Sequence, residues 1–352
     1  MIETLRQKKK IPVAVLGATG SVGQKFIQLL DRHPWFEIAV LAASERSAGR
    51  PYGEAVNWVQ ESPMPGNIAN MKVSASEPGF DVPLVFSALD AAAATGIEKA
   101  FAREGYMVIS NARSYRQHPN VPLMIPEVNS DHLAALEHQP FGAGGIVTNP
   151  NCSTTGMVMA LKPLHDLFGL EQVHVVTLQA LSGAGYPGVS SLDALDNVVP
   201  FISGEEGKME SEPKKLLGRW NGQNFVEEEL RISASCHRVP VLDGHMESIS
   251  VKLKKKATEK QIIEAWESFR ALPQELKLPT APKQPLHYFS REHFPQPRIH
   301  RNLEKGMAVS IGRLRPCSLF DFKFSVLVHN TIRGAAGGAI LNAEMLVAQK
   351  RF

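Results

Sequence analysis

Cysteine, excess charge and long apolar runs are all scarce in this sequence. Its three cysteines, Cys152, Cys236 and Cys317, are an odd number at spacings that match neither a disulfide framework nor a zinc cluster. Lysine and arginine number 38 against 35 for aspartate and glutamate, which gives no electrostatic basis for binding nucleic acid or an anionic membrane. No apolar run approaches the roughly 20 residues of a membrane-spanning helix. The sequence therefore predicts no metal, no nucleic-acid partner and no membrane.

The N-terminal segment 1–17 has a basic run followed by only a short apolar stretch, with no cleavage-site pattern. It indicates a first β-strand rather than an export signal. Together with the unpaired cysteines, this favours a cytoplasmic protein. At 352 residues the chain is too long for one ordinary core, so two joined domains are expected, with one large barrel as the alternative.

Short apolar strands alternate with a helical pattern over the first 150 residues. The predicted strands are 11–16, 37–43, 84–88 and 106–110, and an alanine-rich helix is predicted over 91–104. Such alternation is typical of an α/β fold with a parallel, doubly wound sheet covered on both faces.

After residue 150 the pattern changes. One strong helix follows Cys152, and the strand-like runs beyond it are 172–181, 246–254, 307–313 and 322–329. They predict an α+β domain with a mostly antiparallel sheet covered by helices. Thr258 and Gln261 resemble a capping box that opens the next helix.

Two segments near the C-terminus complete the predicted organisation. Residues 272–301 hold six prolines and are expected to form a surface loop or an arm toward a partner subunit. Residues 332–349 return to a helical pattern. We therefore expect a first domain over 1–150, completed by a C-terminal helix in 331–352, and a second domain over 151–330.

Three glycines occupy the turn between the first strand and the first helix. Missing side chains there let backbone N–H groups and the helix N-terminus approach a pyrophosphate. A GxxGxxG pattern also fits a mere tight turn, but its position favours a Rossmann-type dinucleotide site. The residues expected to bind the cofactor are Gly17, Thr19, Gly20, Ser21, Val22 and Gly23.

The loop after the second strand indicates which dinucleotide is bound. An acidic residue there would hold the ribose hydroxyl of NAD. Instead Ser44, Arg46 and Ser47 offer two hydroxyls and a guanidinium, which suit the 2′-phosphate of NADP(H). Glu45 argues against this assignment, because its carboxylate would favour NAD if the side chain pointed inward. Alternatively, Arg46 is a plain solvated loop charge.

Cys152 lies in the polar turn NPNCST, after an apolar strand and before a helix. A helix N-terminus stabilises a thiolate through its dipole and free backbone donors, and Ser153 or Thr154 supplies a capping hydroxyl. A lone cysteine is more often a buried packing residue, and Cys236 and Cys317 keep that interpretation. The polar setting of Cys152 favours a nucleophile.

Taken in order, the motifs GATGSVG, ASERSAGR, SNARSYR…PEVN, NPNCST, QALSGAGYPG and RVPVLDGH resemble the aspartate-semialdehyde dehydrogenases, particularly their archaeal and fungal branch. The resemblance spans nearly the whole chain. It implies reductive dephosphorylation of L-aspartyl 4-phosphate by NADPH, through a thioester on the cysteine, in the biosynthesis of lysine, threonine and methionine. It also implies a homodimer or homotetramer.

The resemblance assigns roles residue by residue. Cys152 matches the nucleophile, His245 the acid/base histidine and Gln179 the glutamine that orients the acyl intermediate. Arg238, seven residues before His245, matches the clamp on the substrate carboxylate, provided that the bend at 240–244 brings both to one pocket. Without the resemblance, His245 would be interpreted as a structural histidine.

The remaining implied positions surround the phosphate and the nicotinamide. Arg116, with Arg113 and Lys208, would bind the phosphate, and Glu205 would fix Lys208 and the ammonium of aspartate; a plain helix-face ion pair is the alternative. Those implied for the nicotinamide are Ser182, Gly183 and Asn330.

Three other functions stay open at this stage. N-acetyl-glutamyl-phosphate reductase shares the fold and the thioester chemistry, and malonyl-CoA reductase would use the same nucleophile and histidine. A nucleotide-binding protein that has lost its chemistry is the alternative of another class, since fold does not establish function.

Overall fold

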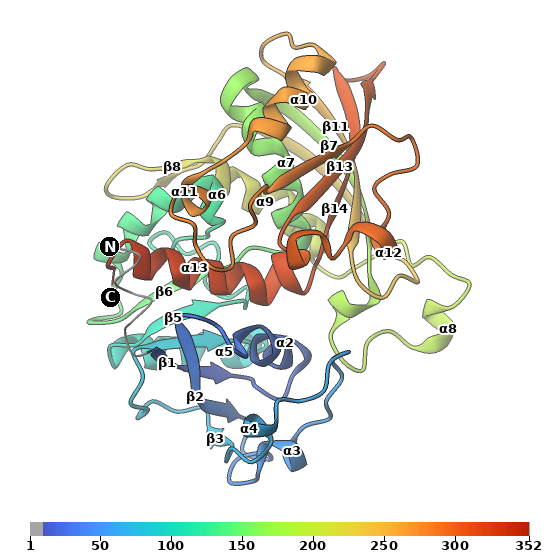
Figure 1. Ribbon diagram of the computed structural model, residues 1–352. Coiled ribbons are helices and arrows are strands. Elements are labelled where there is room, and N and C mark those ends of the chain that lie inside the picture. The colour runs from blue at the N-terminus through green and yellow to red at the C-terminus, as the bar shows by residue number, and fades with distance from the viewer. Residues whose placement is uncertain (1–9, 352) are drawn as a thin grey trace.

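The computed structural model describes residues 10–351, which form two six-stranded sheets with a helix, α13, between them (Figure 1). Within residues 10–351, no helix is long and apolar enough to cross a membrane. The same residues contain no cluster of three or more His, Cys, Asp or Glu side chains that could hold a metal ion.

The first sheet is parallel throughout and has the order β3-β2-β1-β4-β5-β6, which confirms the predicted Rossmann-type fold. The chain leaves β1 in opposite directions toward β2 and β4, and a parallel sheet of this kind binds its ligand at the crevice between two such strands. The strands are β1 Ile11–Leu16, β2 Phe36–Ala43, β3 Ser74–Ala75, β4 Leu84–Ser87, β5 Met107–Ser110 and β6 Gly145–Thr148.

Helices cover both faces of this sheet. Phe26 of α2 and Ile340 of α13 share one core cluster with Val13, whereas Phe101 of α5 packs with Val108 on the opposite face. The segment 332–349 therefore packs on the first sheet, as its apolar pattern indicated. The helices of this part are α2 Ser21–Leu30, α3 Tyr52–Ala55, α4 Gly66–Ala69, α5 Ala91–Arg103, α6 Pro126–Asn129, η1 Ser130–His138 and α13 Gly337–Ala348.

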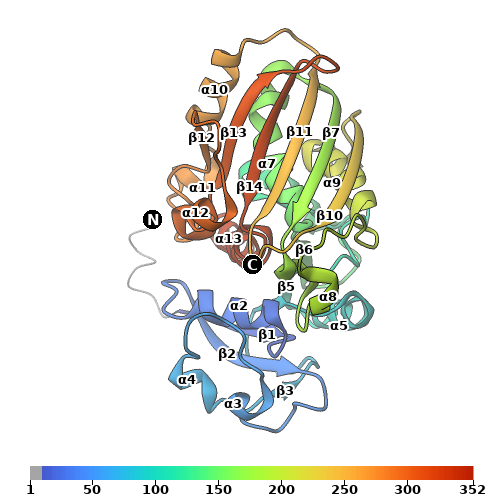
Figure 2. The same ribbon diagram turned by 90° about the vertical axis from the view of Figure 1, so that its right-hand side faces the viewer.

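The second sheet is mixed, with three antiparallel and two parallel pairings in the order β10-β7-β11-β14-β13-β12. Helices α7, α9 and α10 lie behind it when the sheet is viewed as in Figure 2. The strands are β7 Leu170–Gln179, β10 Arg231–Arg238, β11 His245–Leu253, β12 Leu286–Phe289, β13 Val309–Pro316 and β14 Phe322–Val328. Strand β10 is missing from the sequence prediction, because its short polar side chains mask the apolar alternation.

Helices and short elements complete the second part. The capping box of α10 is present: Thr258 N–H donates to Gln261 Oε1 at 2.9 Å. The Pro-rich segment 272–301 is more than a loop, since its strand β12 pairs in parallel with β13. The elements are α7 Cys152–Phe168, η2 Leu181–Ala184, α8 Ser191–Ala194, α9 Glu205–Leu217, β8 Arg219–Trp220, β9 Phe225–Val226, α10 Glu259–Ser268, α11 Leu272–Glu275, α12 Pro297–His300, η3 Leu303–Gly306 and the π-helix η4 Ile332–Ala336.

Candidate active site

Cys152 is the first residue of α7, which follows β6 after three residues, as the sequence predicts. The cap differs from the expectation: it is Asn151, whose Oδ1 accepts the backbone N–H groups of Ser153 at 3.0 Å and Thr154 at 3.1 Å. Asn and Asp are strong caps because their short side chains reach the free donors of the first turn. The start of α7 is thus fixed by the residue before the thiol.

The surroundings of Cys152 favour the protonated form of its thiol. Its side chain keeps part of its surface accessible. Nevertheless, burial raises its pKa to about 12; Glu205 adds to the rise, while Arg116 and the Ser153 N–H oppose it. Desolvation therefore opposes the thiolate that the helix N-terminus was expected to favour.

The backbone of η4 lies directly against Cys152. A Cβ on Gly334 would lie 2.6 Å from the Cβ of Cys152, so only glycine permits this approach. A buried ion pair holds this segment in place: Arg333 donates to both oxygens of Glu127, at 2.8 and 2.6 Å. π-helices are rare, and those that occur often lie at functional sites.

Arg238 and His245 lie side by side, as the resemblance implied. Arg238 is the last residue of β10 and His245 is the first residue of β11. The turn between the two strands reverses the chain, so the two side chains face the same side although they are seven residues apart. A Cβ on Gly183 would meet Arg238 Nη1 at 2.8 Å and His245 Nε2 at 3.1 Å. The exposed backbone of Gly183 therefore covers both side chains.

Hydrogen bonding defines the tautomer of His245. Its Nδ1 accepts the backbone N–H of Ala180 at 3.0 Å, so the neutral ring carries its proton on Nε2. Nε2 is buried and has no partner within residues 10–351. Burial, then the charge of Arg238, lowers the His245 pKa to about 3. The histidine is therefore a neutral N–H donor, rather than the group of near-neutral pKa that the sequence suggested.

Gln179 ends β7 beneath these residues and is buried. Its Nε2 donates to Thr177 Oγ1 at 3.2 Å. Arg238 Nη1 donates to the carbonyl of Ala180, the next residue, at 2.7 Å. The end of β7 therefore positions the guanidinium and, through the Ala180 N–H, the imidazole.

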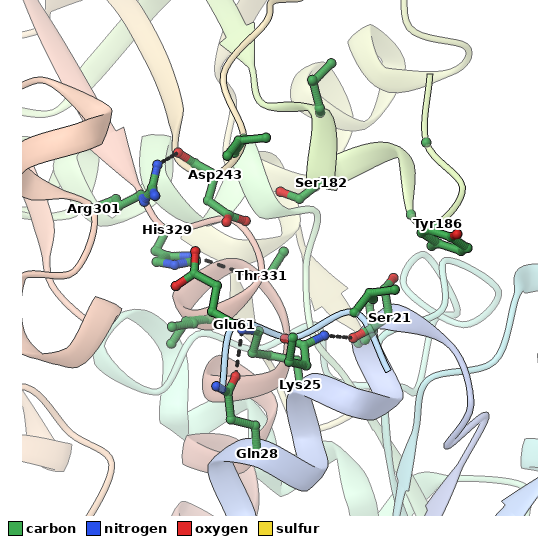
Figure 3. Close-up of a pocket in the computed structure, with 18 of the residues that line it drawn as sticks. Ser21, Lys25, Gln28, Glu61, Ser182, Tyr186, Asp243, Arg301, His329 and Thr331 are labelled. Carbon is green, nitrogen blue, oxygen red and sulfur yellow. Dashed lines mark hydrogen bonds between the residues drawn. The ribbon is translucent and has the colours of Figure 1, made fainter. Parts of the chain in front are cut away.

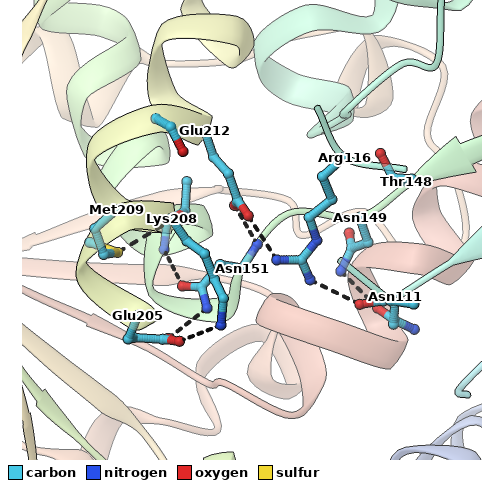
Figure 4. Close-up of polar contacts among 12 residues, drawn as sticks. Asn111, Arg116, Thr148, Asn149, Asn151, Glu205, Lys208, Met209 and Glu212 are labelled. Carbon is cyan, nitrogen blue, oxygen red and sulfur yellow. Dashed lines mark hydrogen bonds and ion pairs between the residues drawn. The ribbon is translucent and has the colours of Figure 1, made fainter. Parts of the chain in front are cut away.

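Helix α9 brings Glu205 and Lys208 to the Cys152 turn (Figure 4). Glu205 Oε1 accepts Asn151 Nδ2 at 2.6 Å, and its Oε2 accepts Lys208 Nζ at 2.8 Å. Burial opposes ionisation of Glu205, but Lys208, Asn151 and Gln179 outweigh it and hold the pKa of this carboxyl below its usual range. The ion pair is thus part of the site and not a solvated helix face.

The two candidate arginines lie in different environments. Arg113 is exposed, and its Nη1 reaches to 3.8 Å from a Cβ built on Gly204, at the start of α9. Arg116 is buried; it donates to Glu212 Oε1 at 2.8 Å and to the Asn111 carbonyl at 2.9 Å. Arg116 therefore enters the site already paired with a carboxylate.

The glycine turn has the shape of an anion site. Gly17 has φ +68°, and a Cβ there would lie 2.6 Å from the Ala88 carbonyl oxygen; one on Gly23 would lie 2.2 Å from that of Gly17. Helix α2, which starts at Ser21, has no side-chain cap within the described chain. Its first N–H groups are therefore free for a pyrophosphate at the carboxyl end of β1. Thr19 lies within the turn, and Val22 lies in the first turn of α2.

The loop after β2 is a turn in which Ser44 O accepts the N–H of Ser47 at 2.9 Å. Arg46 and Glu45 are both exposed, and within residues 10–351 neither makes an ion pair. Arg50, by contrast, donates to the Glu54 carbonyl at 2.6 Å. The guanidinium of Arg46 is therefore available to an anionic group.

A cavity of about 660 Å³ lies between α2 and the second sheet (Figure 3). Ser182 lines it and accepts Asn330 Nδ2 at 2.8 Å, while Asn330 Oδ1 accepts the Gly244 N–H at 2.9 Å. Asn330 thus joins the turn after β7 to the turn before His245. Of the predicted nicotinamide residues, Ser182 lines this cleft, Asn330 is hydrogen-bonded to Ser182, and Gly183 is the next residue along the chain.

Sequence reasoning missed several residues of this site, chiefly Asn151, Glu212 and Gly334. A signal existed for Glu212: residues 205, 208, 212 and 215 are spaced three, four and three apart, which places them on one helical face. No such periodicity identifies Gly334, because its contact with Cys152 joins positions 182 residues apart along the chain, the difference between 334 and 152.

Comparison with known proteins first defines the class. A family model described as semialdehyde dehydrogenase, NAD binding domain, matches residues 12–136, and one described as semialdehyde dehydrogenase, dimerisation domain, matches residues 161–333. The two matches correspond to the two sheets: the NAD binding domain model covers most of the parallel sheet, and the dimerisation domain model covers the mixed sheet. The chain is thus built like the semialdehyde dehydrogenases.

Similarity to individual relatives is closer. The chain is 50% identical to aspartate-semialdehyde dehydrogenase of Schizosaccharomyces pombe, over 95% of this chain and 97% of the relative, and 48% identical to that of Archaeoglobus fulgidus, over 96% and 98%. The chain belongs to the aspartate-semialdehyde dehydrogenase family.

Solved structures agree. Aspartate semialdehyde dehydrogenase with NADP from Candida albicans superposes with a TM-score of 0.91 at 42% identity, covering 98% of this chain and 100% of that one. Aspartate semialdehyde dehydrogenase II complexed with ASA from Vibrio cholerae has a TM-score of 0.79 at 26% identity, covering 97% and 99%.

Proposed function

We propose that this chain is an NADP-dependent aspartate-semialdehyde dehydrogenase, which reduces L-aspartyl 4-phosphate to L-aspartate 4-semialdehyde through an acyl group on Cys152. The observation that carries the proposal is the convergence of Arg238 and His245 on Gly183, beside the buried Gln179 at the end of β7. The family membership supports a role in amino-acid biosynthesis, in the branch that leads to lysine, threonine and methionine.

In the acylation step the sulfur of Cys152 attacks the acyl carbon, the bond from that carbon to the phosphate oxygen breaks, and a thioester forms. The Nδ1 of His245 is occupied by the Ala180 N–H. We therefore assign the thiol proton to the departing phosphate, which leaves as hydrogen phosphate. Thiol plus acyl phosphate thus gives thioester plus hydrogen phosphate, and the step balances without a protein base.

When bound, NADPH supplies a hydride to the thioester carbon. The Nε2–H of His245 stabilises the oxyanion that results, as a fixed donor in a buried site does. Collapse of the oxyanion releases the aldehyde and expels the sulfur as a thiolate, which takes a proton from solvent and becomes the neutral thiol again. Gln179 orients the acyl group through its amide.

Arg238 and Glu205 suit the two charged ends of the aspartyl group. Apart from its bond to Ala180, the guanidinium of Arg238 makes no hydrogen bond within residues 10–351, so its remaining N–H groups can clamp the carboxylate. Glu205 is ionised and suits the ammonium group. Arg113, Arg116 and Lys208 are the cations for the phosphate.

The cofactor residues fit NADP(H). The uncapped start of α2 and the Gly17 turn suit the pyrophosphate. Arg46, with Ser44 and Ser47, would hold the 2′-phosphate, and Ser182, Gly183 and Asn330 would hold the nicotinamide. The C. albicans relative with NADP supports this choice over NAD.

The domain assignment follows the packing. We assign 1–150 with the helix in 331–352 to the cofactor domain, because α13 shares its core, and 151–330 to a catalytic and dimerisation domain. The dimerisation-domain match supports a homodimer or homotetramer. The unpaired thiols of Cys152, Cys236 and Cys317 support a cytoplasmic location.

Purified protein assayed in parallel with four substrates tests the proposal. We expect NADPH oxidation with aspartyl phosphate, and phosphate-dependent NADP reduction with the semialdehyde. A faster reaction with malonyl-CoA or with N-acetyl-glutamyl phosphate would instead assign one of the related reductase activities. NADP binding without any turnover would indicate a nucleotide-binding protein that has lost its chemistry.

A further inference from the structure

Glu212 is a buried carboxylate of this site to which the mechanism above gives no role. It is 2% exposed, and both of its oxygens are engaged (Figure 4). Oε1 accepts Arg116 Nη1 at 2.8 Å, and Oε2 accepts the backbone N–H of Asn151 at 2.7 Å. We infer that Glu212 is a positioning residue, which couples the phosphate-binding arginine to the turn that carries Cys152. The inference rests on the proposed function.

The position of Glu212 on α9 makes it the centre of a row of charged side chains. Glu205, Lys208, Glu212 and Lys215 follow one another on one helical face. Lys215 is buried, and its Nζ donates to the carbonyls of Arg116, His118 and Val121, each at 2.8 Å. The loop that carries Arg116 is therefore attached to α9 at two successive turns, through a side chain and through the backbone.

The same helix face holds Asn151 at two points. Glu205 accepts its side-chain amide and Glu212 accepts its main-chain N–H. Since Asn151 caps α7, these two carboxylates set where the first turn of that helix begins. Loss of one acceptor would leave a buried N–H without a partner and release one side of the Cys152 turn.

Arg116 shares its guanidinium between Glu212, the Asn111 carbonyl and any phosphate, because two of its five N–H groups are engaged within residues 10–351. Nη1 donates to Glu212 and Nη2 to the Asn111 carbonyl, while Nε is buried and has no partner within the described chain. A phosphate at this arginine thus shares the guanidinium with Glu212. The carboxylate sets the place of Arg116 and moderates its charge, whereas the exposed Arg113 makes no ion pair within residues 10–351 and supplies the freer cation.

Glu212→Gln removes the charge and puts an amide opposite Arg116, at unchanged side-chain size. In the phosphate-dependent oxidation of the semialdehyde, we expect the KM for phosphate to rise about tenfold or more, while the Kd of NADP changes by less than about twofold. A folded variant with an unchanged KM for phosphate would overturn the inference. Circular dichroism checks folding; if the variant does not fold, Glu212→Asp keeps the charge but shortens the reach to Arg116, and should raise the KM for phosphate likewise.

Glu210→Gln is the matched control. Glu210 lies on the same helix, and its carboxylate also accepts one backbone N–H, that of Ala234 at 3.1 Å, away from the Cys152 turn. We expect this variant to change neither constant by more than about twofold. An equal rise in the KM for phosphate in both variants would mean that α9 acts only as a scaffold.

The coupling itself is tested by combining Glu212→Gln with Arg116→Gln. If Glu212 acts through Arg116, the double variant should lose little more kcat/KM for phosphate than Arg116→Gln alone, within about threefold. A double loss equal to the product of the two single losses would show independent effects and overturn the coupling.

One measurement needs no substrate, so its failure is separate from failure of the proposed function. Glu212→Ala removes both acceptors, whereas Glu212→Gln keeps one for Asn151. We expect the rate of iodoacetamide alkylation of Cys152 to differ by about threefold or more between these two variants. Equal rates would refute a link from Glu212 to the Cys152 turn.

Discussion

At the scale of single residues, the surroundings of Cys152 and His245 favour the neutral form of both side chains. Burial opposes the thiolate of Cys152, and His245 is a neutral donor because Ala180 N–H occupies its Nδ1. The sequence correctly placed Cys152 at the start of α7, and it placed His245 just before a strand that in fact begins at His245, β11. It did not predict their protonation, since that depends on burial and on charges such as Glu205 and Arg238, which are distant along the chain.

Glu247, two residues after His245, is a third buried group with a shifted pKa. Its carboxyl is 1% exposed, faces Gly156 of α7 and has no hydrogen-bond partner within residues 10–351. Burial raises its pKa well above the usual range. The folded protein therefore retains a proton that the unfolded chain releases above about pH 4.5.

Glu247→Gln should consequently stabilise the protein increasingly as pH rises. As the pH rises from the pKa of Glu247 in the unfolded chain to its pKa in the folded protein, this carboxyl lowers the free energy of unfolding of the wild type by about 1.4 kcal/mol per pH unit. The amide variant has no such loss. The measurement is the melting temperature of both proteins between about pH 5 and 8. Exposed Glu267→Gln is the control, and a difference between variant and wild type that stays constant with pH would contradict the account.

At the scale of elements, α9 and the turns after β1 and β2 organise the ligand groups. Apolar runs predicted most strands within a few residues, because burial on both faces of a parallel sheet leaves continuous apolar sequence. β10 was not predicted, since SASCHR has mixed polarity. η4 lies within the predicted helical segment 332–349, but nothing in IRGAA indicates its π form. The role of α9 needed the structure, because its partners lie on three other segments.

The turn after β2 carries a prediction about cofactor choice. Arg46 is exposed and makes no ion pair with any residue of 10–351, so Arg46→Ala should weaken NADPH binding about tenfold or more, and NADH binding by less than about twofold. Fluorescence titration measures both. Arg50→Ala is the control, because that guanidinium is engaged with the Glu54 carbonyl. Equal losses for both cofactors would argue against a 2′-phosphate clamp.

At the scale of the whole molecule, the site lies where the two sheets meet. The chain crosses between them at α7, where Cys152 begins the helix, and returns through η4 and α13, where Gly334 touches Cys152. Buried contacts tie this return to the first sheet, and Glu344 of α13 also accepts Thr280 N–H at 3.0 Å from the Pro-rich segment. The helical pattern of 332–349 led us to expect that the last helix completes the first domain, but not that its start completes the site.

The account depends on an acyl group carried by one sulfur. Rapid mixing of the protein with aspartyl phosphate in the absence of NADPH, followed by acid quench and peptide mass spectrometry, tests this directly. We predict an aspartyl adduct on Cys152 together with one equivalent of released phosphate per site, and none in Cys152→Ser, which should still bind NADPH. Phosphate release without an adduct on Cys152, or undiminished turnover by the serine variant, would contradict the account.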